Sequence, residues 1–66
     1  MQIYLNGEEK QIPDASNMAR LIELLDLGGQ RIAVEVNEEL VPRSTFDQHQ
    51  LHEQDRIEII QAVGGG

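Results

Sequence analysis

Apolar and polar residues alternate at the start of the chain, over residues 2–5. A period of two is typical of a strand with one buried face. Asn6-Gly7 follows this segment, and the pair favours a type I′ hairpin turn because both residues tolerate a positive φ. We expect the return strand over residues 8–12 and place it at a sheet edge, where its charges oppose pairing with other chains.

A stripe of apolar residues at helical spacing comes next. The stripe consists of Met18, Leu21, Ile22 and Leu25. Because these positions share one face of a helix, they predict a helix over residues 18–27. We expect Ser16 or Asn17 to cap its first turn, and Gly28-Gly29 to end it.

The second half of the chain predicts further strands, over residues 32–36, over residues 40–41 after a turn at 37–39, and within residues 56–63. Residues 44–47, Ser-Thr-Phe-Asp, have the spacing of a capping box and predict a short helical turn. One helix can cover only one face of a sheet. The element order therefore predicts an α+β fold of the β-grasp type, with a mixed sheet of four to five strands packed on one main helix.

The size and charge of the chain limit the classes of function and partner that it can have. The chain has 66 residues, with 12 Asp and Glu against 5 Lys and Arg, and a net charge of −7. Such a surface repels nucleic acids and anionic membranes and suits a partner with a basic face. The absence of Cys excludes disulfides and thiolate chemistry. We expect no membrane segment and no signal peptide, a cytoplasmic location, and a carrier or binding role rather than an enzyme, because so small a core leaves little room for a cleft.

Gly64, Gly65 and Gly66 end the chain. Glycines add no side chain to a core, so we predict a domain over residues 1–63 followed by a flexible tail over residues 64–66. A tail this thin can thread into the active site of another protein. The carboxylate of Gly66 can then attack the α-phosphate of an ATP molecule held by that partner. The alternative is a frayed end without a function.

Other polar residues give weaker signals. His49 and His52 are three residues apart, as in a metal pair, but two histidines are too few for a zinc site, and we expect both to be exposed to solvent. On the outer face of the sheet, Tyr4 and Ile60 are expected to form a small apolar patch ringed by carboxylates. That patch is either a partner-binding surface or a tolerated exposure of Ile60.

Three segments resemble the ThiS-type sulfur carriers of thiamine biosynthesis, a ubiquitin-like family with the β-grasp fold. They are the opening hairpin at residues 1–7, the Asn-x-x-apolar-Val-Pro-Arg segment within residues 36–43, and the last strand with its glycine tail, residues 55–66. The resemblance covers essentially the whole chain. Gln54 departs from the family, which often has Gly before the aspartate that precedes the last strand.

The resemblance implies a function and partners. A ThiF-like adenylating enzyme would use ATP to activate the carboxylate of Gly66, the second residue of the diglycine that Gly65 begins. A cysteine desulfurase or a rhodanese-type protein would supply the sulfur, and the resulting thiocarboxylate would serve thiazole synthase. The chain itself would bind no cofactor and no metal. Arg43 would contribute to partner docking or hold the end of its strand.

Two alternatives share the fold and the tail. One is the small sulfur-carrier subunit of molybdopterin synthase. The other is a ubiquitin-like interaction module or protein modifier.

Overall fold

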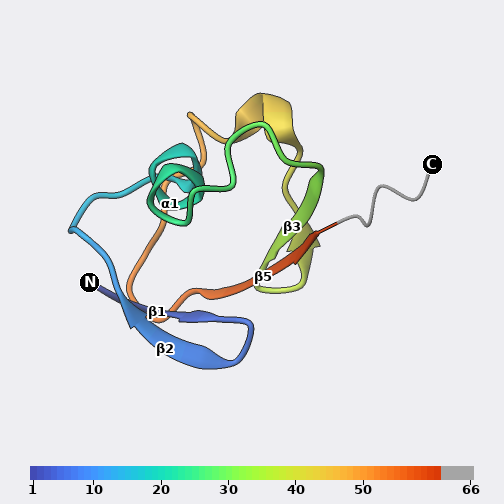
Figure 1. Cartoon of the computed structure of the whole chain (residues 1–66). Coiled ribbons are helices and arrows are strands. Elements are labelled where there is room, and N and C mark those ends of the chain that lie inside the picture. The colour runs from blue at the N-terminus through green and yellow to red at the C-terminus, as the bar shows by residue number, and fades with distance from the viewer. Residues whose placement is uncertain (62–66) are drawn as a thin grey trace.

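A computed structural model describes residues 1–61, which form one mixed sheet and one α-helix (Figure 1). The strands are β1 (Gln2–Leu5), β2 (Glu8–Gln11), β3 (Ile32–Val36), β4 (Glu39–Leu40) and β5 (Arg56–Gln61). Their order in the sheet is β2-β1-β5-β3-β4, so β5 occupies the centre, parallel to β1 and antiparallel to β3. The predicted α+β fold and the predicted edge position of β2 are confirmed. The predicted tail over residues 64–66 lies outside the described residues.

Both hairpins turn on two residues with positive φ. Asn6 and Gly7 have φ of 51° and 84°, which confirms the predicted type I′ turn. Asn37 and Glu38 have φ of 51° and 71°, and they make a second turn of this kind. We predicted a three-residue turn there and a strand over residues 40–41, which is wrong by one residue. Because two residues suffice for the turn, β4 begins at Glu39.

The helix α1 (Met18–Leu24) is shorter than the predicted span of residues 18–27. Asp26 adopts the left-handed conformation, with φ of 58°, before the glycines are reached. The Leu27 amide then donates to the Ile22 carbonyl at 3.0 Å, and the Asp26 amide donates to the Glu23 carbonyl at 3.0 Å. These two bonds close the helix as a Schellman motif, so Asp26 ends it in place of Gly28-Gly29.

The start of α1 confirms one of the two predicted caps. The side-chain oxygen of Asn17 accepts a hydrogen bond from the Arg20 amide at 2.8 Å, as an N-cap residue does. Ser16 is buried and its hydroxyl donates to the Pro13 carbonyl at 2.6 Å. Ser16 therefore stabilises the loop before the helix.

The predicted helical turn over residues 44–47 exists as a 3₁₀ helix, η1 (Arg43–Thr45), which begins one residue earlier. The predicted capping box is wrong, because the N-cap residue is Pro42, which makes no side-chain capping bond. The Thr45 hydroxyl instead donates to the Pro42 carbonyl at 2.9 Å. Proline suits this place because its fixed φ is compatible with the extended conformation of the N-cap residue, which has φ of −67° and ψ of 146°.

The core lies between α1 and the inner face of the sheet. Its buried members are Ile3, Ile12, Met18, Leu21, Ile22, Val34, Val36, Val41, Phe46, Leu51, Ile57 and Ile59. The inward orientation predicted for Ile3, Ile57 and Ile59 is confirmed, while Leu5 is only half-buried at the margin. The strand residues between them point to the outer face, which leaves Ile60 62% exposed.

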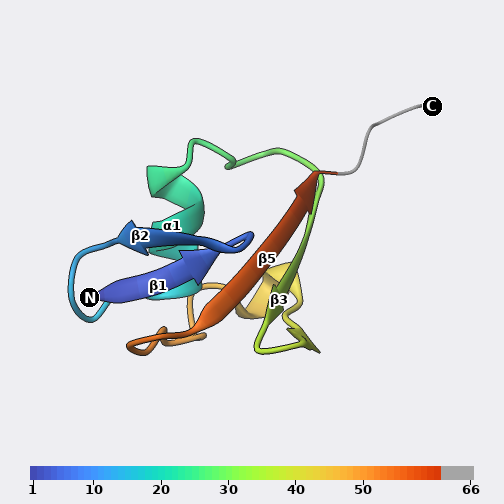
Figure 2. The ribbon, with the colours of Figure 1, turned by 90° about the horizontal axis from the view of Figure 1, so that it is seen from below.

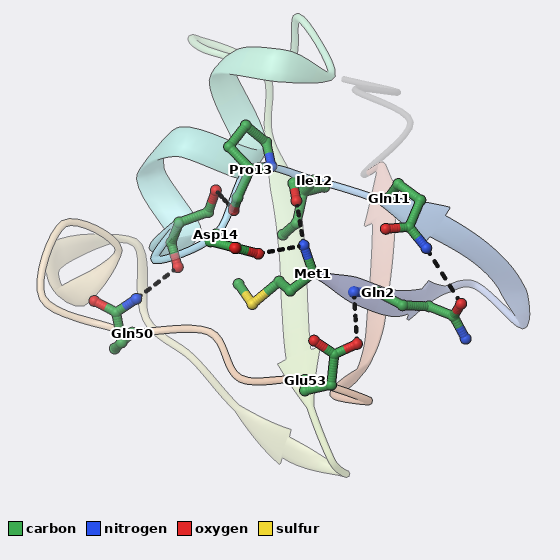
Figure 3. Close-up of polar contacts among 9 residues, drawn as sticks. Met1, Gln2, Gln11, Ile12, Pro13, Asp14, Gln50 and Glu53 are labelled. Atoms are coloured by element: carbon green, nitrogen blue, oxygen red, sulfur yellow. Dashed lines mark hydrogen bonds and ion pairs between the residues drawn. The ribbon is translucent and has the colours of Figure 1, made fainter.

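Polar contacts fix the start of β1 (Figure 3). The amino group of Met1 donates to the Ile12 carbonyl at 2.7 Å and to a carboxylate oxygen of Asp14 at 2.7 Å. This hydrogen bond and, after it, the positive charge of the amino group hold the pKa of Asp14 below its usual value. The Gln2 amide donates to the Glu53 carboxylate at 2.9 Å. The loop before β5 is thereby joined to the strand that β5 pairs with.

Gln54 gives a prediction about stability. Its φ is 71°, a conformation that costs an L-residue roughly 1–2 kcal/mol relative to glycine. We expect Gln54→Gly to raise the free energy of unfolding by about 0.5–1 kcal/mol, because the greater freedom of glycine in the unfolded chain offsets part of the gain. Urea denaturation measures the change. The control Gln54→Ala keeps Cβ and should give no gain, so equal stabilisation by both variants would contradict the strain.

Candidate functional site: the root of the C-terminal tail

Strand β5 carries the predicted reactive end of the chain. Gly64, Gly65 and Gly66 are separated from Gln61, the last residue of β5, by Ala62 and Val63, and they lie outside the described residues. Their predicted flexibility and the role of the Gly66 carboxylate therefore stay predictions. The described residues show the platform from which this segment leaves: a central strand with a neighbour on each side.

Asn6 extends the pairing of β5 beyond the end of β1. Its side-chain oxygen accepts from the Ile59 amide at 2.9 Å, and its side-chain nitrogen donates to the Ile59 carbonyl at 3.3 Å. The Asn6 backbone amide also donates to the Ile57 carbonyl at 2.8 Å. The side chain thus replaces the next residue of a strand and satisfies both backbone groups of Ile59.

Asn37 holds the other end of β5. Its amide donates to the Arg56 carbonyl at 2.7 Å, and its side-chain oxygen accepts from the Arg56 amide at 3.0 Å. Its side-chain nitrogen donates to Asp55 at 3.1 Å, and Asp55, which is 8% exposed, also accepts from the His52 amide at 2.8 Å. The first residue of each type I′ turn therefore clasps β5 from one side.

These clasping residues escaped the sequence analysis. Asn6 and Asn37 were expected only as turn residues, and Asp55 only as the aspartate that precedes the last strand. Their one sequence signal is that both turns begin with Asn. Glycine would serve the backbone of either turn equally well, but it has no side chain to bind a third strand.

The structure separates Tyr4 from Ile60. Both face outward, as predicted, but Tyr4 lies opposite Arg56 while Ile60 lies opposite Ala33, four residues further along β5. At strand spacing this is about 13 Å, so the two side chains do not form one apolar patch. Tyr4 is half-buried and Ile60 is exposed. Their role in partner binding stays a prediction.

Arg43 makes contacts within its own chain. One guanidinium nitrogen donates to the Gln30 carbonyl, in the loop between α1 and β3. The guanidinium carbon lies 5.9 Å from the centre of the Phe46 ring, a distance that permits a cation–π interaction. These contacts support the strand-end role. Partner docking by Arg43 stays a prediction.

We expect Arg43→Ala to lower the free energy of unfolding by about 1–2 kcal/mol, since it removes the bond to Gln30 and the contact with Phe46. Thermal melting checks this. The matched control is Arg31→Ala, at another exposed arginine. If Arg43→Ala were as stable as that control and nevertheless weakened a partner complex, the docking role would replace the structural one.

The two histidines lie in different environments. His52 is exposed and its Nδ1 lies 4.0 Å from an Asp55 oxygen, whereas His49 is half-buried, so the predicted exposure holds only for His52. Within residues 1–61, no three His, Asp or Glu side chains converge as metal ligands. In the same part of the chain, no helix is long and apolar enough to cross a membrane.

Two hollows differ in their relation to the tail. A shallow one of about 450 Å³ lies at the N-terminal end of α1 and includes Pro13 and Glu23. Another, of about 240 Å³, lies where β5 ends. Its lining residues, which we call the tail-root groove, are Leu5, Asn6, Leu25, Leu27, Ile59 and Gln61. The tail-root groove includes Gln61, the last residue of the chain that the structure describes.

The sequence model of the ThiS family matches residues 3–66. The chain belongs to the ThiS family. The matched range includes the three terminal glycines as well as residues that the structure describes. The resemblance predicted from the three segments is thereby confirmed.

Several known proteins are similar in sequence to this chain over its full length. The sulfur carrier protein ThiS of Escherichia coli K12 is 32% identical over 66 residues, which is 100% of both chains. The uncharacterized protein ycf40 of Porphyra purpurea is 36% identical, and the match covers 100% of this chain and 93% of that protein. A thiazole synthase of Paramagnetospirillum magneticum is 33% identical over all of this chain, which corresponds to 20% of that protein.

The fold has a counterpart among solved structures. The crystal structure of the thiamine biosynthesis protein ThiS from Geobacter metallireducens superposes with a TM-score of 0.85, at 26% identity and over 100% of both chains. The predicted β-grasp fold, with one helix packed on a mixed five-stranded sheet, is confirmed.

Proposed function

We propose that the chain is a sulfur carrier of thiamine biosynthesis, which presents the carboxylate of Gly66 to partner enzymes. The observation that carries the proposal is that the family match runs through residue 66 and so includes all three terminal glycines. Likeness to the E. coli sulfur carrier over the full length of both chains supports it. The clasped central strand supports it too, because a fixed platform limits where the tail can reach.

The chemistry proceeds in three steps on the partner enzymes. A carboxylate oxygen of Gly66 attacks the α-phosphorus of ATP on a ThiF-like adenylating enzyme, and pyrophosphate leaves. The terminal sulfur of a persulfide, carried by a cysteine desulfurase or a rhodanese-type protein, then displaces AMP from the acyl-adenylate, and a thiol cleaves the resulting acyl disulfide and is oxidised to a disulfide. The product is a thiocarboxylate on Gly66. The chain contributes no catalytic group and acts as a covalent co-substrate, with ATP consumed by its partner.

Thiazole synthase is the proposed acceptor of the sulfur. Two thiazole synthases, of Paramagnetospirillum magneticum and Magnetococcus marinus, contain a match to the whole of this chain within 20% of their own length. A carrier-like segment and a longer remainder thus occur in one polypeptide, which supports their working together. The proposed location is the cytoplasm, where the ATP for adenylation is available.

Intact-mass analysis tests the proposal. The chain is incubated with ATP, a ThiF-like enzyme and a sulfide source, and we expect a mass gain of one sulfur in place of one oxygen. Fragmentation should place the gain at Gly66. A chain that keeps its mass while a known carrier is converted under the same conditions would reject the proposal. Transfer to thiazole synthase, and not to a molybdopterin synthase large subunit, separates the two sulfur-carrier alternatives.

A further inference from the structure

The free side of β5 lies where the tail begins. The Tyr4 amide donates to the Asp55 carbonyl and the Asn6 amide donates to the Ile57 carbonyl, so every second residue of β5 turns its backbone groups toward β1. By this alternation Gln61 turns the same way, beyond the end of β1. Figure 2 shows β5 continuing past the β1–β2 turn. Within residues 1–61, β3 pairs with Gln61 on one side, and no strand pairs with it on the side of β1.

The tail-root groove opens at this same place. Its walls are four aliphatic side chains from three parts of the chain: the end of β1, the segment after α1, and β5. The three leucines among them are only half-buried. The groove therefore presents uncovered apolar surface in a concave hollow of about 240 Å³, enough for one aliphatic side chain.

The number of residues after Gln61 places this groove close to any enzyme that reacts with Gly66. Five residues separate Gln61 from the end of the chain, and when fully extended they span at most about 17 Å. An enzyme with Gly66 in its active site must therefore have its surface within that distance of Gln61. Since Gln61 lines the groove, the groove lies inside the footprint of such an enzyme.

The charged residues near the groove indicate the chemistry of the enzyme surface that would cover it. None of the residues that line the groove is charged, but Asp26 stands between Leu25 and Leu27 in the sequence, and Glu8 lines another hollow that shares Leu5 with the groove. Both carboxylates are exposed. An apolar side chain bordered by Lys or Arg complements an apolar hollow with acidic margins.

We propose that the tail-root groove receives an aliphatic side chain, flanked by basic residues, from the adenylating enzyme, and that this contact docks the carrier before Gly66 reacts. The inference rests on the proposed function. The adenylating enzyme is the occupant because it is the first enzyme to meet the free carboxylate. The groove acts through docking, so it sets the concentration at which the enzyme is saturated and not the rate of the chemical step.

The test measures ATP–pyrophosphate exchange by a ThiF-like enzyme at varied carrier concentration. We expect Leu27→Gln to raise KM for the carrier by about tenfold or more, with kcat unchanged, because a polar side chain enters an apolar contact. Leu27→Met should restore the wild-type KM. The control Leu24→Gln, at the last residue of α1 and outside the groove, should stay within about twofold of the wild type.

A second variant distinguishes a loss of docking from a loss of folding. Gln61→Trp fills the groove from an exposed position without removing a core side chain, and it should raise KM as Leu27→Gln does. If both variants are folded by circular dichroism and keep the wild-type KM, the inference is overturned while the proposed function stands. Normal adenylation with impaired transfer to thiazole synthase also overturns it. No exchange with the wild-type chain contradicts the proposed function itself.

Discussion

Removal of Gly66 is expected to lower the rate of thiocarboxylate formation by about 10²-fold or more, because an error of about 1 Å at a reacting group already costs that much. The shortened chain ends in the carboxylate of Gly65, about 3.5 Å short of the original position. The fold should not change, since the core is built from residues between Ile3 and Ile59. The rate is followed by intact-mass analysis with the adenylating enzyme and a sulfide source.

A matched variant separates length from steric access. Gly66→Ala keeps the carboxylate at its full reach and adds only one methyl group beside the reacting carbonyl. We expect an intermediate rate, since the narrow passage that a glycine tail implies would hinder the methyl group. Equal rates for the wild type, Gly66→Ala and the shortened chain would contradict the assignment of Gly66 as the reactive residue.

Asn6→Ala is expected to lower the free energy of unfolding by about 2–4 kcal/mol. The substitution removes both side-chain bonds to Ile59 and leaves its backbone groups without these partners. It also places an alanine at φ of 51°, which alanine tolerates poorly. In a domain this small, the melting temperature should fall by roughly 10–20 °C, as measured by circular dichroism.

Two controls divide that effect into its causes. Asn6→Gly accepts the turn conformation but loses the bonds to Ile59, so it should recover about 1 kcal/mol of the loss. Asn6→Asp keeps an oxygen that accepts from the Ile59 amide and loses only the bond to the Ile59 carbonyl. If Asn6→Gly matched the wild type, the clasp on β5 would carry no stability and the turn conformation alone would explain the asparagine.

Local sequence patterns were sufficient for β1, β3, β5 and the first hairpin, but not for the bounds of β4. Alternation set the faces of β1 and β5 correctly, and Asn6-Gly7 identified the turn type of the hairpin, because these features depend on neighbours in the chain. The end of α1 was missed by three residues. Asp26 rarely signals a helix end from sequence, yet the Schellman closure at this position brings Leu27 back against the core.

The candidate site also contains one part that local sequence predicts and another that depends on the pairing of distant strands. Gly64–Gly66 are visible as a composition signal, whereas the clasps depend on which strand becomes the neighbour of each turn. Asn6 and Ile59 are 53 residues apart, and only the sheet order brings them together. The prediction of an apolar patch from Tyr4 and Ile60 was wrong because it, too, depended on how two distant strands pair. Alternation fixed the face of each residue, but the register of β1 against β5 fixed their separation.

The central position of β5 has a mechanical consequence. A pull on the chain beyond Gln61 that runs along β5 would act on its hydrogen bonds to β1 and β3, which lie on either side. Those bonds would be loaded together in shear, whereas the bonds of an edge strand can open one after another. The central strand would therefore resist a pull that would peel an edge strand away.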